Sequence, residues 1–301
     1  MKPILIKLYI FLRNCLRAIF ELPVTIDCAI SKSLYSLTVK KKDNLNRTAV
    51  NPVFSVQQYV AHGEYDLPYP NNSLQLFQAV IKLGFKIIEC DVMFTKDNIP
   101  ILCHDQRVTK LVKTDDGQKA DLKICNTPYS EIKNLNFSID GNSHTSVTTL
   151  EELLVFAKDN GICIEIDLNK KYLGRKKSKL LFDLVQKENM LSSVIWEVYP
   201  KDLFSFMLLD HHLIYQLDNT WNKKAIKKYK RYQKHSSLII LSQWFPDKVE
   251  GDYEEIVKEG HRNGYLMKCA TLNRQEETQK LFCQSVDFIT TDSLTNDKII
   301  I

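Results

Sequence analysis

The chain has 301 residues, of which 44% are hydrophobic and 26% are charged. Nine glycines, nine prolines and the lack of any low-complexity tract exclude a fibrous chain and a chain that is disordered throughout. The net charge of +5 comes from residues 1–50, where nine Lys and Arg against three acidic residues leave +6, so the rest of the chain sums to −1. The main body has no basic excess, and we expect no nucleic-acid partner.

Three basic residues, Lys7, Arg13 and Arg17, interrupt the apolar stretch at the N-terminus. The uncharged pieces are far shorter than the ~20 apolar residues of a spanning helix, and a small-residue cleavage site of a signal peptide is lacking. On a helical wheel, residues 2–21 separate into a basic side and an apolar side. This pattern fits a helix that lies on an anionic membrane surface, and equally one that packs on the following domain. We expect residues 1–40 to contact such a surface, with docking on the domain as the alternative.

The eight cysteines are not spaced as a disulfide framework. No two are separated by only two residues, and Cys90, Cys103, Cys163 and Cys269 lie within apolar, strand-like runs. Cysteines in such runs are typically buried thiols, which favours a reducing compartment. We therefore expect a cytoplasmic protein, peripheral on the membrane if the N-terminal segment binds lipid.

Apolar strand-like runs alternate with helix-like periods from about residue 50 onward. We divide the chain into a basic amphipathic N-terminal segment with its linker, residues 1–49, and one domain, residues 50–301. The predicted strands are Gln58–His62, Lys86–Val92, Gly161–Leu168, Ser193–Val198, Leu213–Leu217, Leu238–Ser242, Tyr265–Ala270 and Asp287–Thr290. The predicted helices are Ser73–Leu83, Leu150–Asp159, Lys176–Glu188, Lys201–Leu208, Lys223–Lys234, Tyr253–Asn263 and Arg274–Cys283. Eight strands separated by helices predict an α/β protein with a (β/α)₈ TIM barrel fold.

One connection in this layout is much longer than the others. Residues 93–148, between the second strand and the helix that follows it, contain a strand-like piece of their own, Ile99–Cys103. We expect a small insertion at the top of the barrel. A doubly wound open sheet is the competing fold, but no glycine-rich dinucleotide motif follows the first strand.

Paired carboxylates end two consecutive strands. Glu89 and Asp91 are two residues apart and therefore share one face of their strand, and Glu165 and Asp167 repeat the arrangement on the next. Catalytic groups of such barrels project from the C-terminal strand ends. Like charges in apolar surroundings need a cation, and oxygen ligands suit Mg²⁺ or Ca²⁺. A salt bridge to a neighbouring Lys or Arg is the alternative. The other polar strand-end residues are Glu197, Gln216, Gln243, Lys268 and Asp292.

Two histidines also end strands on the same side of the predicted barrel, His62 and His104. Beside a divalent cation they supply what phosphodiester cleavage needs. One imidazole takes a proton from the nucleophile while the other gives one to the leaving alcohol.

The segment from Ala61 to Asp105 resembles the core signature of the glycerophosphodiester phosphodiesterase family. The shared features are a strand-end His (His62), an Asn-Thr-like turn (Asn72-Ser73), an E-x-D strand (Glu89-Cys90-Asp91), a T-K-D-G-x-P-V-like turn (Thr95 to Ile101) and a closing His-Asp (His104-Asp105). The segments ICIEID and VDFITTDS resemble later strands of the family, so the likeness spans about residues 58–294.

The resemblance implies a barrel with an insertion after the second strand, a metal bound by Glu89, Asp91 and Glu165, and His62 and His104 as the acid–base pair. It also places Asn72 near the substrate. Two cations of the family pattern are replaced here, an Arg by Gly63 and a Lys by Asp167. We therefore expect Asp167 and Lys268 to contact the substrate, with Lys170, Lys171 or Lys268 restoring one positive charge.

We thus predict a metal-dependent phosphoric diester hydrolase, using Mg²⁺ or Ca²⁺, that acts on a glycerophosphodiester or a related phosphorylated lipid or glycan. Its partner would be a small phosphodiester or a lipid head group. The alternatives are a catalytically weak barrel that binds phosphodiesters without turnover, and a phospholipase C- or D-like lipase.

Overall fold

The computed structural model describes Ile30, Lys32 and residues 51–108, 121–137, 145–168, 173–199, 202–209, 213–233, 236–245, 249 and 251–296. Apart from Ile30 and Lys32, the N-terminal segment of residues 1–49 lies outside this part of the chain, and so does its predicted amphipathic helix. Among the described residues, no helix reaches the length and apolarity of a membrane-spanning segment.

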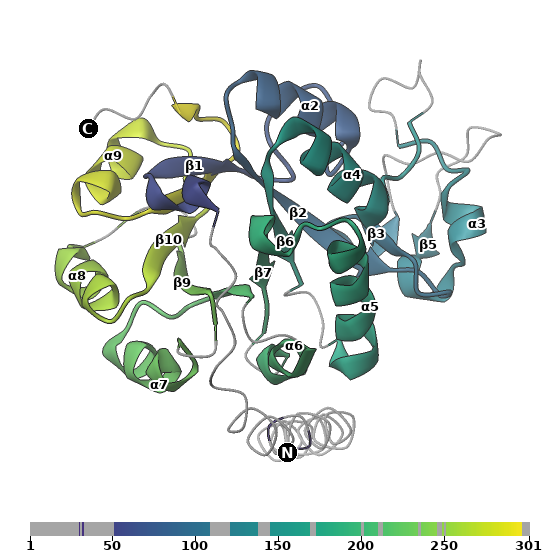
Figure 1. Ribbon diagram of the computed structural model, residues 1–301. Coiled ribbons are helices and arrows are strands. Elements are labelled where there is room, and N and C mark those ends of the chain that lie inside the picture. The colour runs from purple at the N-terminus through teal and green to yellow at the C-terminus, as the bar shows by residue number, and fades with distance from the viewer. Residues whose placement is uncertain are drawn as a thin grey trace, which may run out of the picture.

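Eight parallel strands of the described chain close into a barrel (Figure 1). They are β1 (Gln58–Ala61), β2 (Ile87–Phe94), β6 (Cys163–Asp167), β7 (Val194–Glu197), β8 (Ile214–Leu217), β9 (Leu238–Trp244), β10 (Leu266–Ala270) and β11 (Phe288–Thr291). Each strand pairs with its neighbour in this order, and β1 pairs with both β2 and β11. The predicted (β/α)₈ barrel is confirmed, and each predicted strand overlaps an observed one.

Helices surround the barrel (Figure 1). They are α2 (Leu74–Lys82), α4 (Leu150–Asn160), α5 (Gly174–Lys187), α6 (Leu203–Leu209), α7 (Lys223–Gln233), α8 (Glu254–Arg262) and α9 (Gln275–Cys283), with short 3₁₀ turns η2 (Pro52–Ser55) and η4 (Leu191–Ser193). The ends of α4 show why the chain changes direction there. Thr149 and Glu152 form a reciprocal capping box at its start, and Gly161 ends it in the left-handed conformation that glycine tolerates best.

A small insertion stands between β2 and α4, on one side of the barrel (Figure 1). Its strand β3 (Pro100–Leu102) pairs antiparallel with β2, and β4 (Arg107–Val108) pairs with β5 (Leu122–Lys123). The turn η3 (Ile124–Asn126) and the one-turn helix α3 (Tyr129–Ile132) follow. The insertion has an apolar cluster of its own: Met93, Ile101, Val108, Ile124, Ile132, Leu135 and Val147.

Apolar side chains fill the barrel interior toward the N-terminal ends of its strands. Seven strands each contribute one inward side chain to a buried layer: Val60, Ile87, Cys163, Ile195, Ile214, Ile240 and Phe288. Because side chains alternate along a strand, the residue two positions later points to the same side, one level higher. Those next residues are His62, Glu89, Glu165, Glu197, Gln216, Ser242 and Thr290. The interior therefore changes from apolar to polar within one step along each strand.

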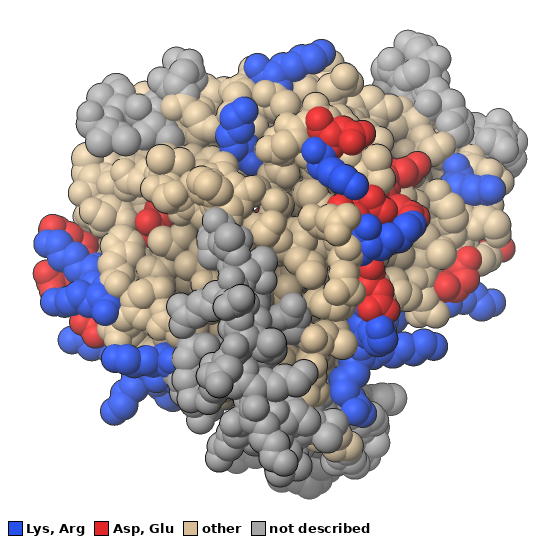
Figure 2. All heavy atoms as spheres, in the orientation of Figure 1, with Lys and Arg blue, Asp and Glu red and all other residues tan. Residues whose placement is uncertain are grey.

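The outer surface carries charges of both signs. Around α4 and α5, acidic and basic side chains are interspersed, as in the ion pair of Lys187 with Glu151 (Figure 2). Helix α7 differs, because it has no acidic residue and its exposed side chains include Lys223, Lys224 and Lys227. Basic side chains gather at that edge of the molecule in Figure 2.

Candidate active site

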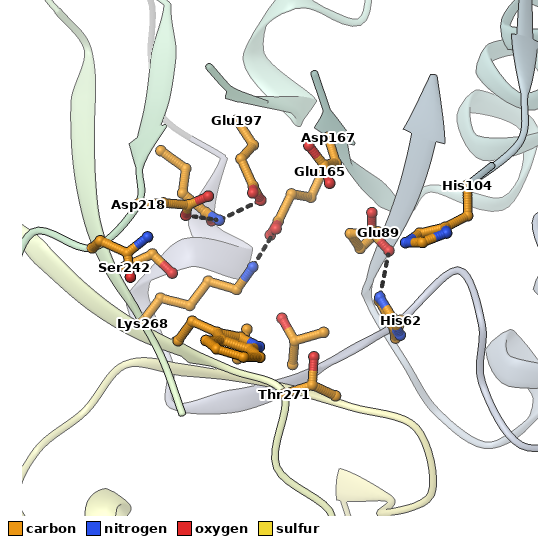
Figure 3. Close-up of a pocket in the computed structure, with 15 residues that line it drawn as sticks. His62, Glu89, His104, Glu165, Asp167, Glu197, Asp218, Ser242, Lys268 and Thr271 are labelled. Atoms are coloured by element: carbon orange, nitrogen blue, oxygen red, sulfur yellow. Dashed lines mark hydrogen bonds and ion pairs between the residues drawn. The ribbon is translucent and has the colours of Figure 1, made fainter. Parts of the chain in front are cut away.

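The polar ends of the barrel strands form one pocket with a volume of about 340 Å³. It is lined by His62, Glu89, His104, Glu165, Asp167, Glu197, Gln216, Asp218, Asn219, Ser242, Trp244, Lys268, Ala270, Thr271 and Thr290 (Figure 3). Most residues predicted for the site therefore meet here. Asp91 and Asn72 are buried directly beside it.

Three carboxylates from β2 and β6 crowd together. Strands β2 and β6 pair in a register that places Glu89 beside Glu165 and Asp91 beside Asp167. One oxygen each of Glu89, Asp91 and Asp167 lie within 4.8 Å of one another. Burial raises the pKa of Glu89 well above its ordinary value, and the charges of Asp91 and Asp167 raise it further. The three groups thus form an all-oxygen cluster with an excess of negative charge.

Glu165 has a different partner. The ammonium of Lys268 reaches across from β10 and donates to Glu165 Oε1 (Figure 3). Both residues are almost fully buried, at 0% and 1% exposure. Burial disfavours the charged form of Lys268, but the neighbouring Glu165 and Glu197 outweigh this and raise its pKa. Glu165 Oε2 is buried and has no hydrogen-bond partner among the described residues.

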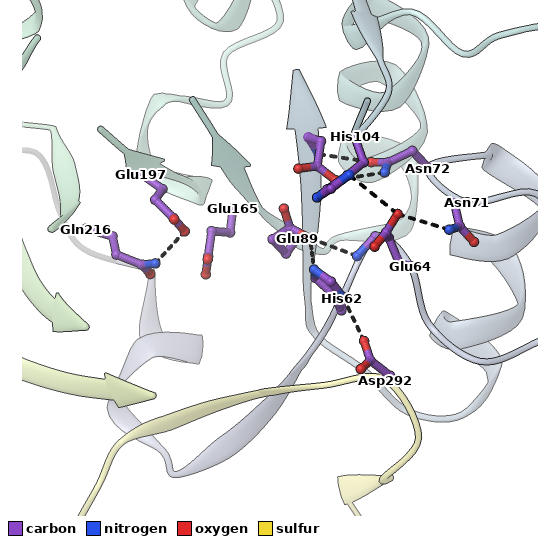
Figure 4. A network of polar contacts seen from close by, with 12 residues as sticks. His62, Glu64, Asn71, Asn72, Glu89, His104, Glu165, Glu197, Gln216 and Asp292 are labelled. Atoms are coloured by element: carbon purple, nitrogen blue, oxygen red, sulfur yellow. Dashed lines mark hydrogen bonds and ion pairs between the residues drawn. The ribbon is translucent and has the colours of Figure 1, made fainter. Parts of the chain in front are cut away.

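His62 is held from two sides. Its Nδ1 lies 2.7 Å from Asp292 Oδ1, and its Nε2 lies 3.7 Å from Glu89 Oε2 (Figure 4). Burial lowers the pKa of His62, but the hydrogen bond to Asp292 and the charges of Glu89, Asp292 and Asp91 outweigh it and raise the pKa to about 9.

His104 stands at the rim of the pocket, just after β3, with a side chain that is 40% exposed. Its Nδ1 lies 3.0 Å from Asp105 Oδ1 and 3.9 Å from Glu64 Oε1. Asn71 donates to the same Glu64 oxygen (Figure 4). The insertion thus carries this imidazole to the edge of the barrel opening, while His62 lies deeper.

Asn72 holds Asp91 of the carboxylate cluster by two hydrogen bonds. Its amide donates to Asp91 Oδ2 at 3.0 Å, and its carbonyl oxygen accepts from the backbone N–H of Asp91 at 2.9 Å. The adjacent Gly63 donates its N–H to Glu89 Oε2 at 2.8 Å. A Cβ on Gly63 would lie 2.8 Å from Asn72 Oδ1, so a side chain such as the family's Arg requires the Asn72 amide to move.

The opposite wall of the pocket holds the predicted strand-end residues Glu197 and Gln216, and beside them Asp218, Ser242 and Trp244, which our strand-end predictions missed. Gln216 donates to Glu197, whose pKa burial and the charge of Asp218 raise well above the ordinary value. Ser242 and Trp244 line the pocket on β9, whereas the predicted strand-end residue Gln243 does not. Alternation along β9 accounts for this, because Gln243 lies between two inward-facing positions. The same rule applied to Gln216 would have identified Asp218.

The donor set suits a hard divalent cation. Glu89, Asp91 and Asp167 offer only oxygen atoms, and Glu165 adds a buried, unpartnered oxygen nearby. Oxygen-only ligands favour Mg²⁺ or Ca²⁺ over zinc. Since buried carboxylates repel one another, a cation would also relieve the crowding that raises the pKa of Glu89.

Comparison with known proteins relates this barrel to glycerophosphoryl diester phosphodiesterases. The "Glycerophosphoryl diester phosphodiesterase family" model matches residues 64–295. A solved putative glycerophosphoryl diester phosphodiesterase from Silicibacter pomeroyi has a TM-score of 0.65 at 17% identity, with 83% of this chain and 93% of that chain covered. An Oleispira antarctica phosphodiesterase was solved with the product sn-glycerol-3-phosphate. It has a TM-score of 0.64 at 18% identity, with 80% of this chain and 95% of that chain covered.

Two curated relatives are similarly distant. An uncharacterized Bacillus subtilis protein, YqiK, is 24% identical over 77% of this chain and 93% of its own length. Human glycerophosphodiester phosphodiesterase 1 is 24% identical over 60% of this chain and 56% of its own. A barrel with this pocket and this family match is a phosphoric diester hydrolase. The chain belongs to the glycerophosphoryl diester phosphodiesterase family, as a divergent member.

Proposed function

We propose that the protein hydrolyses a glycerophosphodiester, or a related phosphorylated lipid or glycan, in this pocket, with His62 and His104 as an acid–base pair beside a divalent cation. The observation that carries the proposal is that both histidines line the same pocket as the carboxylates of β2 and β6, in a chain of this family. The family match does not favour the two alternatives, a binding barrel without turnover and a lipase.

The histidines differ in how they meet a substrate. Because Asp292 engages Nδ1 of His62, proton exchange by this ring occurs through Nε2. His104 lies at the exposed rim, where a departing alcohol leaves toward solvent. We assign His62 as the group that takes the proton of the nucleophile, and His104 as the group that protonates the leaving alcohol.

Glu89 and Asp91 hold the cation together with a carboxylate from β6, which the family resemblance assigns to Glu165. A divalent cation at this position supplies electrostatic stabilisation for the charge that grows on the phosphate oxygens. Asn72 fixes Asp91 through two hydrogen bonds, so its effect on the substrate runs through that carboxylate.

The remaining pocket residues suit the organic part of the substrate. Lys268 brings the one ammonium among the described lining residues, and Gln216 Oε1 and Thr290 Oγ1 are buried without hydrogen-bond partners. Hydroxyl groups of a glycerol or sugar would satisfy such atoms. The product bound by the Oleispira antarctica phosphodiesterase has this chemistry.

A diester panel tests the proposal. Purified full-length protein is incubated with glycerophosphocholine, glycerophosphoethanolamine, glycerophosphoglycerol and a lysophospholipid, each with Mg²⁺, Ca²⁺ or chelator. We expect cation-dependent release of glycerol phosphate from one or more of the three glycerophosphodiesters. Saturable, cation-dependent binding without hydrolysis of any diester would instead identify the non-catalytic barrel, and selective cleavage of the lysophospholipid would identify the lipase.

A further inference from the structure

The two carboxylates of β6 do not have the same surroundings. Asp167 pairs in register with Asp91, and its carboxylate is grouped with those of Glu89 and Asp91 within 4.8 Å. Glu165, one level lower, pairs in register with Glu89, yet it is not in that group. Its Oε1 accepts a hydrogen bond from Lys268 instead.

This arrangement reverses the charges that the family resemblance implies for β6. There, a Glu serves as metal ligand and a Lys two residues later contacts phosphate. Here, the second position is Asp167, and the ammonium comes from β10 as Lys268. The positive charge has moved to the opposite wall of the barrel, where it neutralises Glu165. A negative charge has taken its place beside the β2 carboxylates.

We propose that Asp167, in place of Glu165, is the third carboxylate ligand of the cation site, and that Lys268 retains Glu165 as its ion-pair partner. The assignment rests on the cation site of the proposed function and specifies which residue of β6 completes it. Asp167 thereby changes from a predicted substrate contact to a ligand. Lys268 becomes the fixed positive charge at the floor of the pocket.

Charge balance supports this division. A divalent cation among Glu89, Asp91 and Asp167 would meet three carboxylates that already bring one oxygen each within 4.8 Å of one another. Glu165 lies outside this group, and its Oε1 is held by the buried ammonium of Lys268, a charge that would be costly to leave uncompensated. The carboxylate that already lies in the group, Asp167, is therefore the better candidate for the third ligand.

Matched amide variants test the assignment by cation binding, without reference to turnover. Mn²⁺ and Mg²⁺ are titrated calorimetrically into full-length wild type, Asp167→Asn, Glu165→Gln and Asp183→Asn. Asp183 is a surface residue of α5 and controls for loss of one acidic charge. We expect Asp167→Asn to weaken Kd by on the order of tenfold or more, since loss of even outer-shell partners costs that much. Glu165→Gln and Asp183→Asn should change Kd less than about threefold.

The opposite ranking, with Glu165→Gln the weaker binder, would overturn the proposal, as would equal losses in both.

Thermal melting in chelator gives a second measurement. Since Asp167→Asn removes one of three mutually repelling carboxylates, it should melt no lower than Asp183→Asn; a much lower melting temperature would contradict the charge argument. If wild type binds cation but hydrolyses no diester, the proposed function fails while the ligand ranking stands. If wild type binds no cation at millimolar concentration, the ligand assignment fails whatever the hydrolysis assay shows.

Discussion

Asp292 Oδ1 lies 2.7 Å from Nδ1 of His62, and the strands that precede these residues pair directly, with Ala61 beside Thr291. The other carboxylate oxygen of Asp292 accepts from Asn273 at 2.7 Å. Both oxygens are therefore held, and the imidazole has one fixed orientation with Nε2 toward Glu89. Closure of the barrel between its first and last strands creates this contact.

Replacing Asp292 by Asn should impair turnover far more than folding. An amide at this position no longer fixes the tautomer of His62, and in a comparable histidine–carboxylate pair of a serine protease that loss lowers kcat by ~10⁴-fold. We expect a loss of at least about 10²-fold in kcat with little change in melting temperature. Asp287→Asn is the matched control, because Asp287 pairs with His261 outside the pocket. Equal turnover in Asp292→Asn and wild type would contradict a positioning role for Asp292.

The stabilisation that the pair of His261 and Asp287 gives the fold should depend on pH. His261 Nε2 lies 2.8 Å from Asp287 Oδ2; this hydrogen bond raises the pKa of His261, while partial burial opposes it. A raised pKa means that the pair stabilises the fold fully below about pH 6.5, and that this contribution is lost as pH rises through the folded-state pKa. The melting-temperature difference between wild type and His261→Gln should therefore be larger at about pH 6 than at about pH 9. A difference that is constant, or that grows with pH, would show that the ion pair contributes nothing.

The fold could be predicted from the sequence because eight short, mainly apolar strand-like runs alternate with helix-like periods. Glu89, Asp91 and Glu165 could be placed by strand alternation alone. Partners across the barrel could not. Lys268 lies 103 positions from Glu165, and only the closed geometry of the sheet brings its ammonium to that carboxylate.

The environment of His62 could not be predicted from the local sequence either. Its raised pKa depends on Asp292, 230 residues away, and on the β2 carboxylates. Trp244 and Ser242 were missed for a simpler reason. Strand β9 runs to Trp244, two residues beyond the predicted end at Ser242, so the inward face that Ser242 and Trp244 share was not identified.

Removing one carboxylate of β2 should abolish the response to divalent cations. Because a ligand that binds only the native state stabilises it by RT ln(1 + [L]/Kd), Mg²⁺ or Ca²⁺ should raise the melting temperature of wild type. Glu89→Gln should lose this rise and keep its stability in chelator, because the buried Glu89 carboxylate is disfavoured by Asp91 and Asp167. Thermal melting with cation and with chelator makes the comparison. A rise in Glu89→Gln as large as in wild type would exclude Glu89 as a ligand.

Residues 1–40 should confer binding to anionic membranes. Full-length protein should sediment with phosphatidylserine-containing liposomes, less so at high salt because screening weakens its charge attraction, while a chain beginning at Asn51 should remain in the supernatant. The basic surface of α7 is the competing site. A variant of full length with Lys223, Lys224, Lys227 and Lys230 changed to Gln tests it. If that variant loses binding and the shortened chain retains it, α7 rather than the N-terminal segment is the membrane contact.

The acid–base pair can be resolved by the choice of leaving group. If His62 and His104 exchange protons with the substrate, Ala at either position should lower kcat on a glycerophosphodiester by ~10²–10⁴-fold. Nitrophenolate departs without needing a proton. Hydrolysis of a nitrophenyl diester should therefore survive the loss of the general acid but not the loss of the base. We expect His104→Ala to be rescued by this substrate and His62→Ala to remain impaired, because His104 lies at the exposed rim and His62 beside Glu89. Rescue of His62→Ala alone would exchange the two roles. Full turnover of both substrates by both variants would remove the histidines from the mechanism.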